Sequence, residues 1–292
     1  MYGHRAVLLN EALSYLDPRA GRRFIDATFG GGGHTQALLE RTAPDGAVLA
    51  LDLDDAALEN GRTLQSAYGS RLTLVKANFR DIQAVAQAQG FMDADGILAD
   101  IGVSSTMLDD PARGFSFMRE GPLDMRMDRS QPLTAAEIVN TYKEKELADI
   151  LYIYGEERRS RPIAHSIVRA RPLATTSDLS RAVVRVLGSP RYGRIHPATR
   201  TFQALRIAVN AELENLQFFL NSAPGCLRPG GRVAVITFHS LEDRIVKNSF
   251  RASVVPGKAL TKKVVTATDE EVESNPRARS AKLRVWEKSN GH

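Results

Sequence analysis

The chain is poor in cysteine. Cys226 is the single thiol among 292 residues, so neither an internal disulfide nor a cysteine-rich zinc site can form. This excludes a secreted disulfide scaffold and indicates a reducing compartment. The remaining composition, 43% hydrophobic and 25% charged, is typical of a globular protein and excludes an intrinsically disordered one.

Long apolar runs are also missing. No stretch approaches the roughly 18 apolar residues that span a bilayer. The N-terminal residues reach a carboxylate at Glu11 without a long apolar segment, so no signal peptide is expected. The sequence therefore predicts a cytoplasmic protein with no membrane partner.

One segment lacks lysine and nearly lacks acids. Between Gly155 and Arg206 there are eleven arginines and three acids, a net charge of +8, whereas the whole chain carries +5 and the remainder therefore −3. The planar fork of arginine suits phosphates and base edges better than lysine does. A solvated helical face is the alternative, but unbalanced charge of this size favours a nucleic-acid partner. The arginines are 158, 159, 161, 169, 171, 181, 185, 191, 194, 200 and 206.

The first hundred residues alternate short apolar strands with helices. Near-continuous apolar strands separated by helices are typical of a parallel sheet covered on both faces. The predicted strands are 24–29, 47–52, 72–79 and 96–100. Between them, one helix is predicted to end at about residue 41, and two more are predicted at 54–67 and 82–89.

The alternation stops after the fourth predicted strand. Residues 105–200 show no convincing strand and predict helices, after which a helix over 198–221 and strands at 232–238 and 281–287 restore the pattern. The simplest fold class is α/β, a Rossmann-like sheet with an inserted all-helical domain. The predicted catalytic domain is 1–104 with 201–292, and the insertion, 105–200, is the candidate RNA-recognition domain.

Four glycines, Gly30 to Gly33, follow the first strand and open a helix with His34. A phosphate-binding P-loop needs Gly-Lys-Ser/Thr, but Gly33 is followed by His34 and Thr35. A dinucleotide-binding fingerprint that starts at Gly30 needs a third glycine at position 35, which is Thr35 here, so neither pattern is present. An adenosine ligand without a pyrophosphate, such as S-adenosylmethionine, remains. A plain tight turn is the alternative for the glycines, and a hydrogen bond to a backbone carbonyl is the alternative for His34.

Polar or aromatic residues end the next strands. Asp52 follows the last glycine by 19 residues and is placed to accept the two ribose hydroxyls, while Asn78 and Phe79 could flank adenine. Ligands of open α/β sheets bind beyond the carboxyl ends of the strands, where these residues should gather.

Asp100 ends the fourth strand. A carboxylate there can accept a hydrogen bond from an exocyclic amine, align its lone pair and take its proton. Capping the turn at Ser104 and Ser105 is the alternative. Cys226 lies in a turn before a strand and is expected to be a small buried core residue. Because methylation of a cytosine ring carbon uses a cysteine nucleophile, this favours methyl transfer to nitrogen or oxygen over carbon.

Seven motifs distributed along nearly the whole chain are familiar as a set. Together they resemble the bacterial small-subunit (16S) ribosomal RNA cytosine-N4 methyltransferase family. The resemblance implies methyl transfer from S-adenosylmethionine to a cytidine amine in the decoding region, with no metal. The motifs are Phe29 to His34, Ala99 to Ser105, Arg113 to Met118, Gly121 to Asp128, His196 to Arg206, Phe238 to Arg244 and Asn275 to Ser280.

The resemblance also implies roles for single residues. Met107 stands where the family usually has glutamine, so only a backbone contact to the cofactor is expected there. Asp124 and Arg126 could line the target cleft or pair with each other, and His239 and Ser240 could hold the base or cap a helix. The cofactor residues that the resemblance implies are Gly32, Gly33, His34, Asp52, Phe79, Asp100 and Met107. The further candidates for RNA contact are Asp124, Arg126, His196, Arg200, His239 and Ser240.

Two other functions stay open from the residues alone. A nicotinamide-dependent oxidoreductase is disfavoured by the missing third glycine of its fingerprint. An RNA-binding module with a degenerate cofactor fold is disfavoured by the intact Gly32, Gly33, Asp52 and Asp100. The sequence also leaves open whether free RNA or the assembled small ribosomal subunit is the substrate, and whether the protein is a homodimer.

Overall fold

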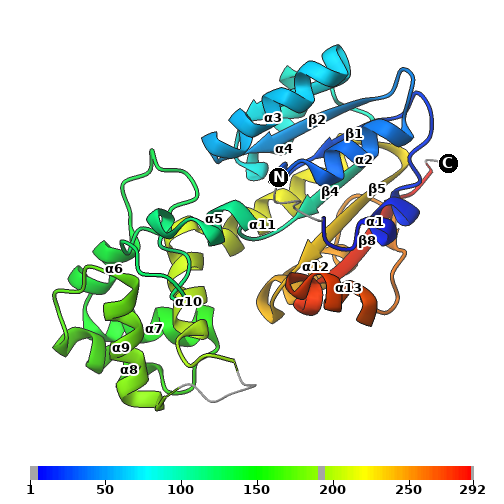
Figure 1. Cartoon of the computed structure of the whole chain (residues 1–292). Coiled ribbons are helices and arrows are strands. Elements are labelled where there is room, and N and C mark those ends of the chain that lie inside the picture. Colours follow the sequence, from blue (N-terminus) through cyan, green and yellow to red (C-terminus); the bar gives the residue numbers. More distant parts are fainter. Residues whose placement is uncertain (1–5, 190–194, 291–292) are drawn as a thin grey trace. The chain divides into compact units, whose positions relative to one another are not determined.

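The computed structural model describes residues 6–189 and 195–290. The chain divides into two compact units (Figure 1). The sheet unit comprises Met1–Gly102 and Leu213–His292, and the helical unit is Val103–Glu212. The second junction therefore lies twelve residues after the predicted one at residue 200, because α10 (Thr199–Asn210) packs against α7 (Glu144–Gly155) within the helical unit.

Within the described residues, the sheet has eight strands in the order β3-β2-β1-β4-β5-β8-β6, with β7 also paired to β8. The first five strands in this order are parallel, and β8 runs antiparallel to β5. The strand order reverses between β1 and β4, which is where α/β sheets bind ligands. The strands are β1 Arg23–Asp26, β2 Ala47–Asp52, β3 Leu72–Lys76, β4 Ala94–Asp100, β5 Leu227–Thr237, β6 Gly257–Ala259, β7 Val265–Thr266 and β8 Lys282–Lys288.

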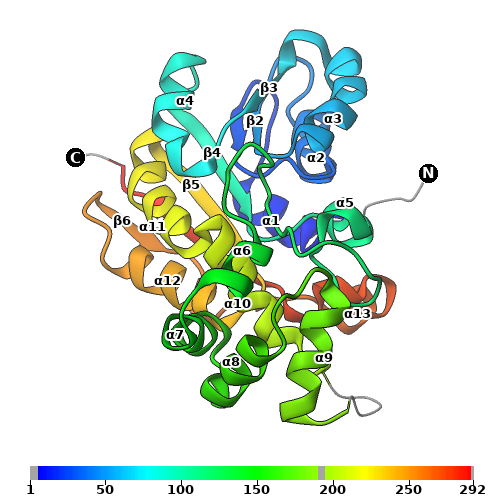
Figure 2. The same cartoon turned by 90° about the vertical axis from the view of Figure 1, so that its left-hand side faces the viewer.

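Successive strand residues bury opposite faces of the sheet, as period-2 side chains must. Ile25 and Ile97 belong to one core with residues of α4, α11 and α12, while Phe24 and Leu98 belong to another with residues of α1, α2 and α3. Figure 2 shows α4, α11 and α12 along one face. The helices are α1 Leu9–Leu16, α2 Gly33–Arg41, α3 Asp55–Tyr68, α4 Ile82–Ala88, α11 Glu212–Ser222, α12 Ser240–Arg251 and α13 Asp269–Ser274.

The helical unit has a hydrophobic core of its own. Leu147 and Leu151 of α7, Ile163 of α8 and Leu205 of α10 are fully buried in it. A separate core lets this insertion form without disturbing the sheet. Its other helices are α5 Ser105–Asp109, α6 Ala135–Thr141, α8 Ser160–Arg169 and α9 Thr176–Leu187.

The predicted elements differ from the observed ones in a few places. The helix expected over 198–221 is two helices, because Ala211 adopts a left-handed φ of +49° between α10 and α11. β1 ends at Asp26 and β3 at Lys76, both earlier than predicted. Five short elements were not predicted from the sequence: α1, α5, α13, β6 and β7.

None of the helices within residues 6–189 and 195–290 is long and apolar enough to cross a bilayer.

Candidate active site

Three carboxylates end neighbouring parallel strands of the sheet unit. Asp26 closes β1, Asp52 closes β2 and Asp100 closes β4. Because β1 lies between β2 and β4, their carboxyl ends meet at one edge of the sheet, at the point where the strand order reverses. Asp26 was not predicted from the sequence, although an acid at the end of an apolar strand was the signal that identified the other two.

The glycine loop closes over this edge. The Gly30 N–H donates to Asp52 Oδ2 at 2.7 Å, which ties the loop to β2. Gly32 has a φ of +77°, and a Cβ there would lie 2.8 Å from Phe29 Cζ. A Cβ on Gly33 would lie 3.1 Å from the Cβ of Ala6. Glycine is therefore required at Gly32 by both backbone conformation and space.

Gly32→Ala is expected to destabilise the fold by about 1–3 kcal/mol and to weaken cofactor binding, because the left-handed φ and the contact with Phe29 both oppose a methyl group. Chemical denaturation and calorimetric titration with adenosylhomocysteine would measure the two effects. Gly69→Ala is the matched control, since Gly69 also has a positive φ, +57°, but nothing lies within 4 Å of its Cβ position. Equal losses of cofactor affinity in both variants would show that the loop does not shape the cofactor site.

Asp52 is a half-buried hydrogen-bond acceptor. Its Oδ1 accepts from the Asp54 N–H at 2.8 Å, and its Oδ2 accepts from Gly30. Burial raises the pKa of Asp52, while these backbone hydrogen bonds oppose the rise. A carboxylate oxygen can accept more than one hydrogen bond, so both oxygens retain capacity for the hydroxyls of a ribose.

Asp100 is held by its backbone and has an unsatisfied side chain. Its N–H donates to Thr28 Oγ1 at 2.6 Å, and its side chain is 18% exposed. Within the described residues, the buried Oδ1 has no hydrogen-bond partner. Burial, followed by the charges of Asp26 and Glu242, raises the pKa of Asp100 to about 8. A buried carboxyl with an orphan oxygen and a pKa near neutrality is suited to receive a polar or cationic ligand and to exchange a proton.

Asp26 is fully buried and accepts hydrogen bonds from residues on both sides of the glycine loop. Its Oδ1 accepts from the Thr28 N–H at 3.1 Å, and its Oδ2 accepts from Thr35 Oγ1 at 2.6 Å. Burial raises the pKa of Asp26 to about 7, although both threonine contacts lower it. Asp26 thus fixes both ends of the glycine loop and adds negative charge beside Asp100.

His34 lies between the N-terminal segment and Asp100. Its Nε2 lies 3.0 Å from the carbonyl oxygen of Val7, and its Nδ1 lies 3.8 Å from Asp100 Oδ2. A carbonyl only accepts hydrogen bonds, so Nε2 carries the proton. The contact with the backbone, the alternative raised for this residue, is therefore present.

Phe79, Asn78 and His239 also follow strands of the sheet unit, and each makes a local contact. Phe79, at the start of a short 3₁₀ turn after β3, packs edge-on against Phe219 with ring centroids 5.6 Å apart. Asn78 Oδ1 accepts from the Arg80 N–H and caps that turn. His239 caps α12, since its Nδ1 accepts from the Glu242 N–H at 3.4 Å, and Ser240 is exposed at the first position of that helix.

Glu242 was not singled out from the sequence. It is fully buried, and its Oε2 accepts from the N–H groups of Phe238 at 2.8 Å and His239 at 3.2 Å. Its Oε1 lies 2.9 Å from His239 Nε2. The imidazole of His239 therefore caps α12 through Nδ1, while Nε2 lies within ion-pair distance of Glu242.

The structure gives the predicted residues of the helical unit local partners. The Met107 side chain is 5% exposed in the hydrophobic core, and its N–H donates to Ser104 Oγ at 3.2 Å. Both the Met107 N–H and its side chain are thus engaged within the helical unit, and a backbone contact of Met107 to the cofactor stays a prediction. The Ser104 hydroxyl caps α5, so the turn does not require Asp100 as its cap.

Asp124 and Arg126 pair with each other, as one of the two alternatives held. Arg126 Nε donates to Asp124 Oδ1 at 2.8 Å and Nη2 donates to Oδ2 at 2.9 Å. Burial acts to raise the pKa of Asp124, but the hydrogen bonds and charge of Arg126 outweigh it, and the pKa is lowered. The pair closes a loop, and Arg126 also donates to the carbonyls of Arg129 and Gln131.

His196 and Arg200 lie near the start of α10. The His196 ring stacks on Phe117 with centroids 4.3 Å apart, and its Nδ1 accepts from the Ala198 N–H. Burial lowers the pKa of His196, so the ring is neutral at pH 7 and does not act as a cation. Arg200 is exposed and donates to the Glu156 carbonyl at 3.3 Å.

The arginine-rich segment separates into structural and exposed residues. Arg171 donates to the carbonyls of Val139 and Tyr142, and Arg206 forms a two-bond pair with Glu212, both at 2.8 Å. Arg191 and Arg194 lie outside the described residues. The exposed arginines are Arg158, Arg159, Arg161, Arg169, Arg181, Arg185 and Arg200.

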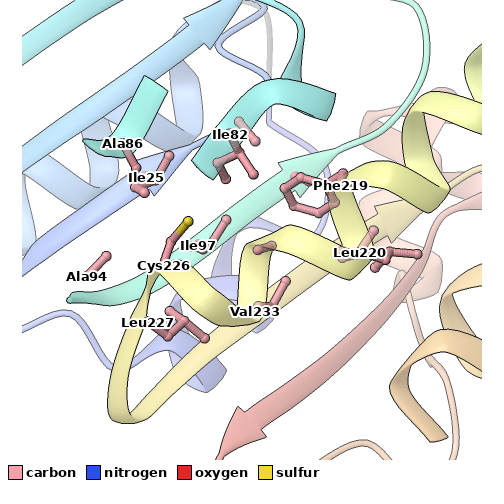
Figure 3. Packing of buried hydrophobic residues seen from close by; sticks show 14 of the residues in the cluster. Ile25, Ile82, Ala86, Ala94, Ile97, Phe219, Leu220, Cys226, Leu227 and Val233 are labelled. Carbon is pink, nitrogen blue, oxygen red and sulfur yellow. The ribbon is translucent and has the colours of Figure 1, made fainter. Parts of the chain in front are cut away.

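Cys226 is a buried filler, as predicted. It is fully buried, and Figure 3 shows it in the core with Ile97, Leu227 and Val233. Burial raises the pKa of its thiol to about 11, so the thiolate needed for attack on a carbon is not available at neutral pH. Within the described residues, no three His, Cys, Asp or Glu side chains are grouped so that they could hold a metal ion.

Comparison with known proteins identifies the family. The model of the MraW methylase family matches residues 1–289. Proteins called ribosomal RNA small subunit methyltransferase H are similar over nearly their whole length. The relative from Thermomicrobium roseum is 52% identical and covers 98% of this chain and 93% of its own, and the relative from Sorangium cellulosum is 52% identical and covers 99% and 91%. The solved structure of TrmN from Thermus thermophilus is more distant, with 18% identity, a TM-score of 0.46 and coverage of 96% of this chain and 48% of its own.

A match over almost the entire chain, together with identities above half, leaves no room for the oxidoreductase alternative. The sheet order, the glycine loop and the carboxylates at the strand ends are the framework expected of a Rossmann-like, S-adenosylmethionine-dependent methyltransferase. The chain belongs to the MraW methylase family.

Proposed function

We propose that the protein methylates the exocyclic N4 amine of a cytidine in the decoding region of small-subunit (16S) ribosomal RNA. The names of the relatives support the small-subunit RNA as the substrate. The observation that carries the choice of an amine is Asp100, whose buried Oδ1 has no partner within the described residues and can accept an N–H from the substrate.

The residues at the sheet edge fit S-adenosylmethionine as the cofactor. The glycine loop would approach the ligand closely, Asp52 would accept the ribose hydroxyls, and Phe79 would offer an aromatic edge beside adenine. The unsatisfied Asp100 oxygen, in a region that already holds the negative charge of Asp26, suits a ligand with positive charge. S-adenosylmethionine supplies, when bound, an electrophilic methyl group on a sulfonium cation.

Asp100 would act on the nucleophile. The lone pair of the cytosine amine is delocalised into the ring, so the amine attacks poorly without help. A hydrogen bond from the amine to Asp100 aligns the nitrogen, and Asp100 takes one proton from it as the new N–C bond forms. The pKa of about 8 places the carboxyl near the operating pH, where proton transfer is most effective.

A cysteine-dependent transfer to carbon lacks support. The single thiol is buried in the core, on the turn before β5, with its pKa raised to about 11. The sheet unit therefore offers a carboxylate for an amine substrate and no thiolate for a ring carbon.

The exposed arginines of the helical unit would bind the RNA backbone. Arg158 and Arg159 lie in the turn between α7 and α8, and Arg161 lies in the first turn of α8. Arg200 reaches the turn between α7 and α8 through the Glu156 carbonyl. Phosphate neutralisation by such a cluster is independent of sequence and weakens as salt increases. The target base must leave its stack to reach the Asp100 carboxylate, which favours a loop or single-stranded site.

Replacing Arg161 and Arg169 of α8 by glutamine is expected to raise the apparent KM for small ribosomal subunits about tenfold, because two exposed phosphate contacts are lost. The affinity for adenosylhomocysteine should not change, since both residues belong to the helical unit. Lys145→Gln, an exposed cation flanked by Glu144 and Glu146 in the same unit, is the control. An unchanged KM in the double variant, or an equal rise in the control, would contradict the role of these arginines.

Incubation of the purified protein with labelled S-adenosylmethionine and either 16S RNA or small ribosomal subunits tests the proposed reaction. Digestion to nucleosides should release label in N4-methylcytidine. Label in a ring-methylated cytidine, or in no cytidine from either substrate, would refute the proposal.

A further inference from the structure

We infer that the exposed face of α12 is a second contact surface for the RNA backbone, on the sheet unit itself. Its basic stripe consists of Arg244, Lys247 and Arg251, all of which are exposed. The inference rests on the proposed function, because it takes single-stranded RNA as the partner. It adds a surface outside the arginine-rich segment 155–206.

The spacing places the three cations on one face. Residues three and four apart are neighbours on a helix surface, so Arg244, Lys247 and Arg251 form a continuous row. At 1.5 Å per residue, the row extends about 10 Å along the axis. The opposite face of α12 is buried, with Val246 and Phe250 in the core of the sheet unit.

The acids of the same helix are turned away from the stripe. Glu242 is fully buried and accepts the Phe238 and His239 N–H groups. Asp243 accepts from Arg284 Nε at 2.6 Å and lies 3.7 Å from Lys282 Nζ. Both carboxylates of α12 are thus committed to the interior or to β8, and the exposed face carries positive charge.

Helix electrostatics explain only part of this pattern. A cation in the last turn interacts favourably with the helix dipole, which accounts for Arg251. Arg244 lies near the start of α12, where the dipole disfavours a cation, and Lys247 lies in the middle. The residues outside the segment 155–206 also carry a net negative charge, so three outward cations on one helix do not follow from composition.

The stripe begins close to the candidate active site within the same unit. α12 starts three residues after β5 ends, and Ile236 of β5 is paired with Asp100 of β4. An RNA strand whose target base reaches Asp100 must continue on either side of that base. A row of cations leading away from this sheet edge can neutralise the phosphates of one flank.

The test compares salt-dependent RNA binding of two double variants. Lys247→Gln/Arg251→Gln removes two cations of the stripe and leaves Arg244 in place. Lys262→Gln/Lys263→Gln removes the same charge from another exposed site of the sheet unit. The probe is a fluorescent single-stranded RNA, and its anisotropy is titrated between 50 and 200 mM salt.

We expect the stripe variant to bind about tenfold more weakly and to lose about 1.4 from the slope of log K against log salt, which corresponds to two phosphate contacts on a single strand. The Lys262/Lys263 variant should behave like the unmodified protein, and adenosylhomocysteine affinity should be equal in all three. A stripe variant with unchanged affinity and slope, or an equal loss in both variants, overturns the inference. If the stripe variant loses binding but the unmodified protein forms no N4-methylcytidine, the proposed function fails and the RNA surface stands.

Discussion

Asp100→Asn is expected to lower kcat for methylation of small ribosomal subunits by about a thousandfold, because general-base catalysis and the alignment of the amine are lost together. An amide can still accept a hydrogen bond through its oxygen, but it cannot take the proton from N4. The apparent KM for the RNA substrate should change little, since Asp100 lies outside the cationic surfaces. Steady-state assays with labelled cofactor measure both constants.

The same substitution should stabilise the protein without ligands. The folded pKa of about 8 lies above the ordinary value of 3.8, so the folded carboxyl holds its proton more tightly than the unfolded one. The free energy of unfolding therefore decreases as pH rises from about 4 to about 8, and the asparagine removes this loss. At pH 8 the gain is expected to be on the order of 5 kcal/mol, since a shift of about four pKa units at about 1.4 kcal/mol each is removed, and denaturation measures it.

Asp93→Asn is the matched control for Asp100→Asn. Asp93 is exposed just before β4 and has a positive φ of +61°, a conformation that asparagine adopts as readily as aspartate. It should leave both turnover and stability unchanged. Turnover of Asp100→Asn within tenfold of the unmodified protein would contradict the role of Asp100 in proton transfer.

The affinity for S-adenosylmethionine is expected to rise about fiftyfold between pH 6 and pH 8, as the ionised fraction of Asp100 rises from about one per cent to about one half. A cationic cofactor is favoured by the ionised form of Asp100, and a carboxyl with a pKa of about 8 is only about one per cent ionised two units lower. Binding below pH 8 must therefore release a proton. Above about pH 9 the affinity should level off, because Asp100 is then almost fully ionised.

Two comparisons separate Asp100 from its titratable neighbours Asp26, Glu242 and His34. Adenosylhomocysteine lacks the positive charge, so its affinity should vary much less over the same range. Asp100→Asn should flatten the dependence for the cationic cofactor while leaving the neighbours in place. Calorimetric titration in buffers of different ionisation enthalpy measures the released proton directly. An equally steep dependence in the variant would assign the proton to another group.

The sheet edge could be predicted from the sequence because its signals are local. An apolar run that ends on an acid identifies both a strand and the position of its last residue, as at Asp52 and Asp100. Four consecutive glycines before a helix mark the loop that needs a left-handed φ at Gly32. The rule that ligands bind beyond the carboxyl ends of parallel strands then brings these residues together.

Other features depend on partners that are distant in the sequence. The pairing of His34 with the Val7 carbonyl, and of Arg206 with Glu212, assigns structural roles that composition cannot reveal. Arg161 is exposed, whereas Arg171 is half-buried and donates to the Val139 carbonyl. The sequence around each arginine does not distinguish the two cases, because they differ only in tertiary packing. The break at Ala211 follows from a single left-handed residue that carries no turn signal such as glycine or proline.

The electrostatic coupling of Asp100 to other carboxylates could not be predicted from the sequence either. Asp26 and Glu242 are separated by more than 200 residues, yet both raise the pKa of Asp100. Their contribution arises because the sheet and the start of α12 bring three carboxylates into a region with little solvent. Spacing along the chain gives no indication of it.

The most direct test of the proposed function is mass mapping of modified nucleosides in 16S ribosomal RNA from cells with and without this protein. The account predicts that one cytidine of the decoding region loses its N4-methyl group in the absence of the protein and regains it when the protein is restored, but not when Asp100→Asn is supplied. An N4-methyl group that persists at every decoding-region cytidine in the depleted cells would contradict it.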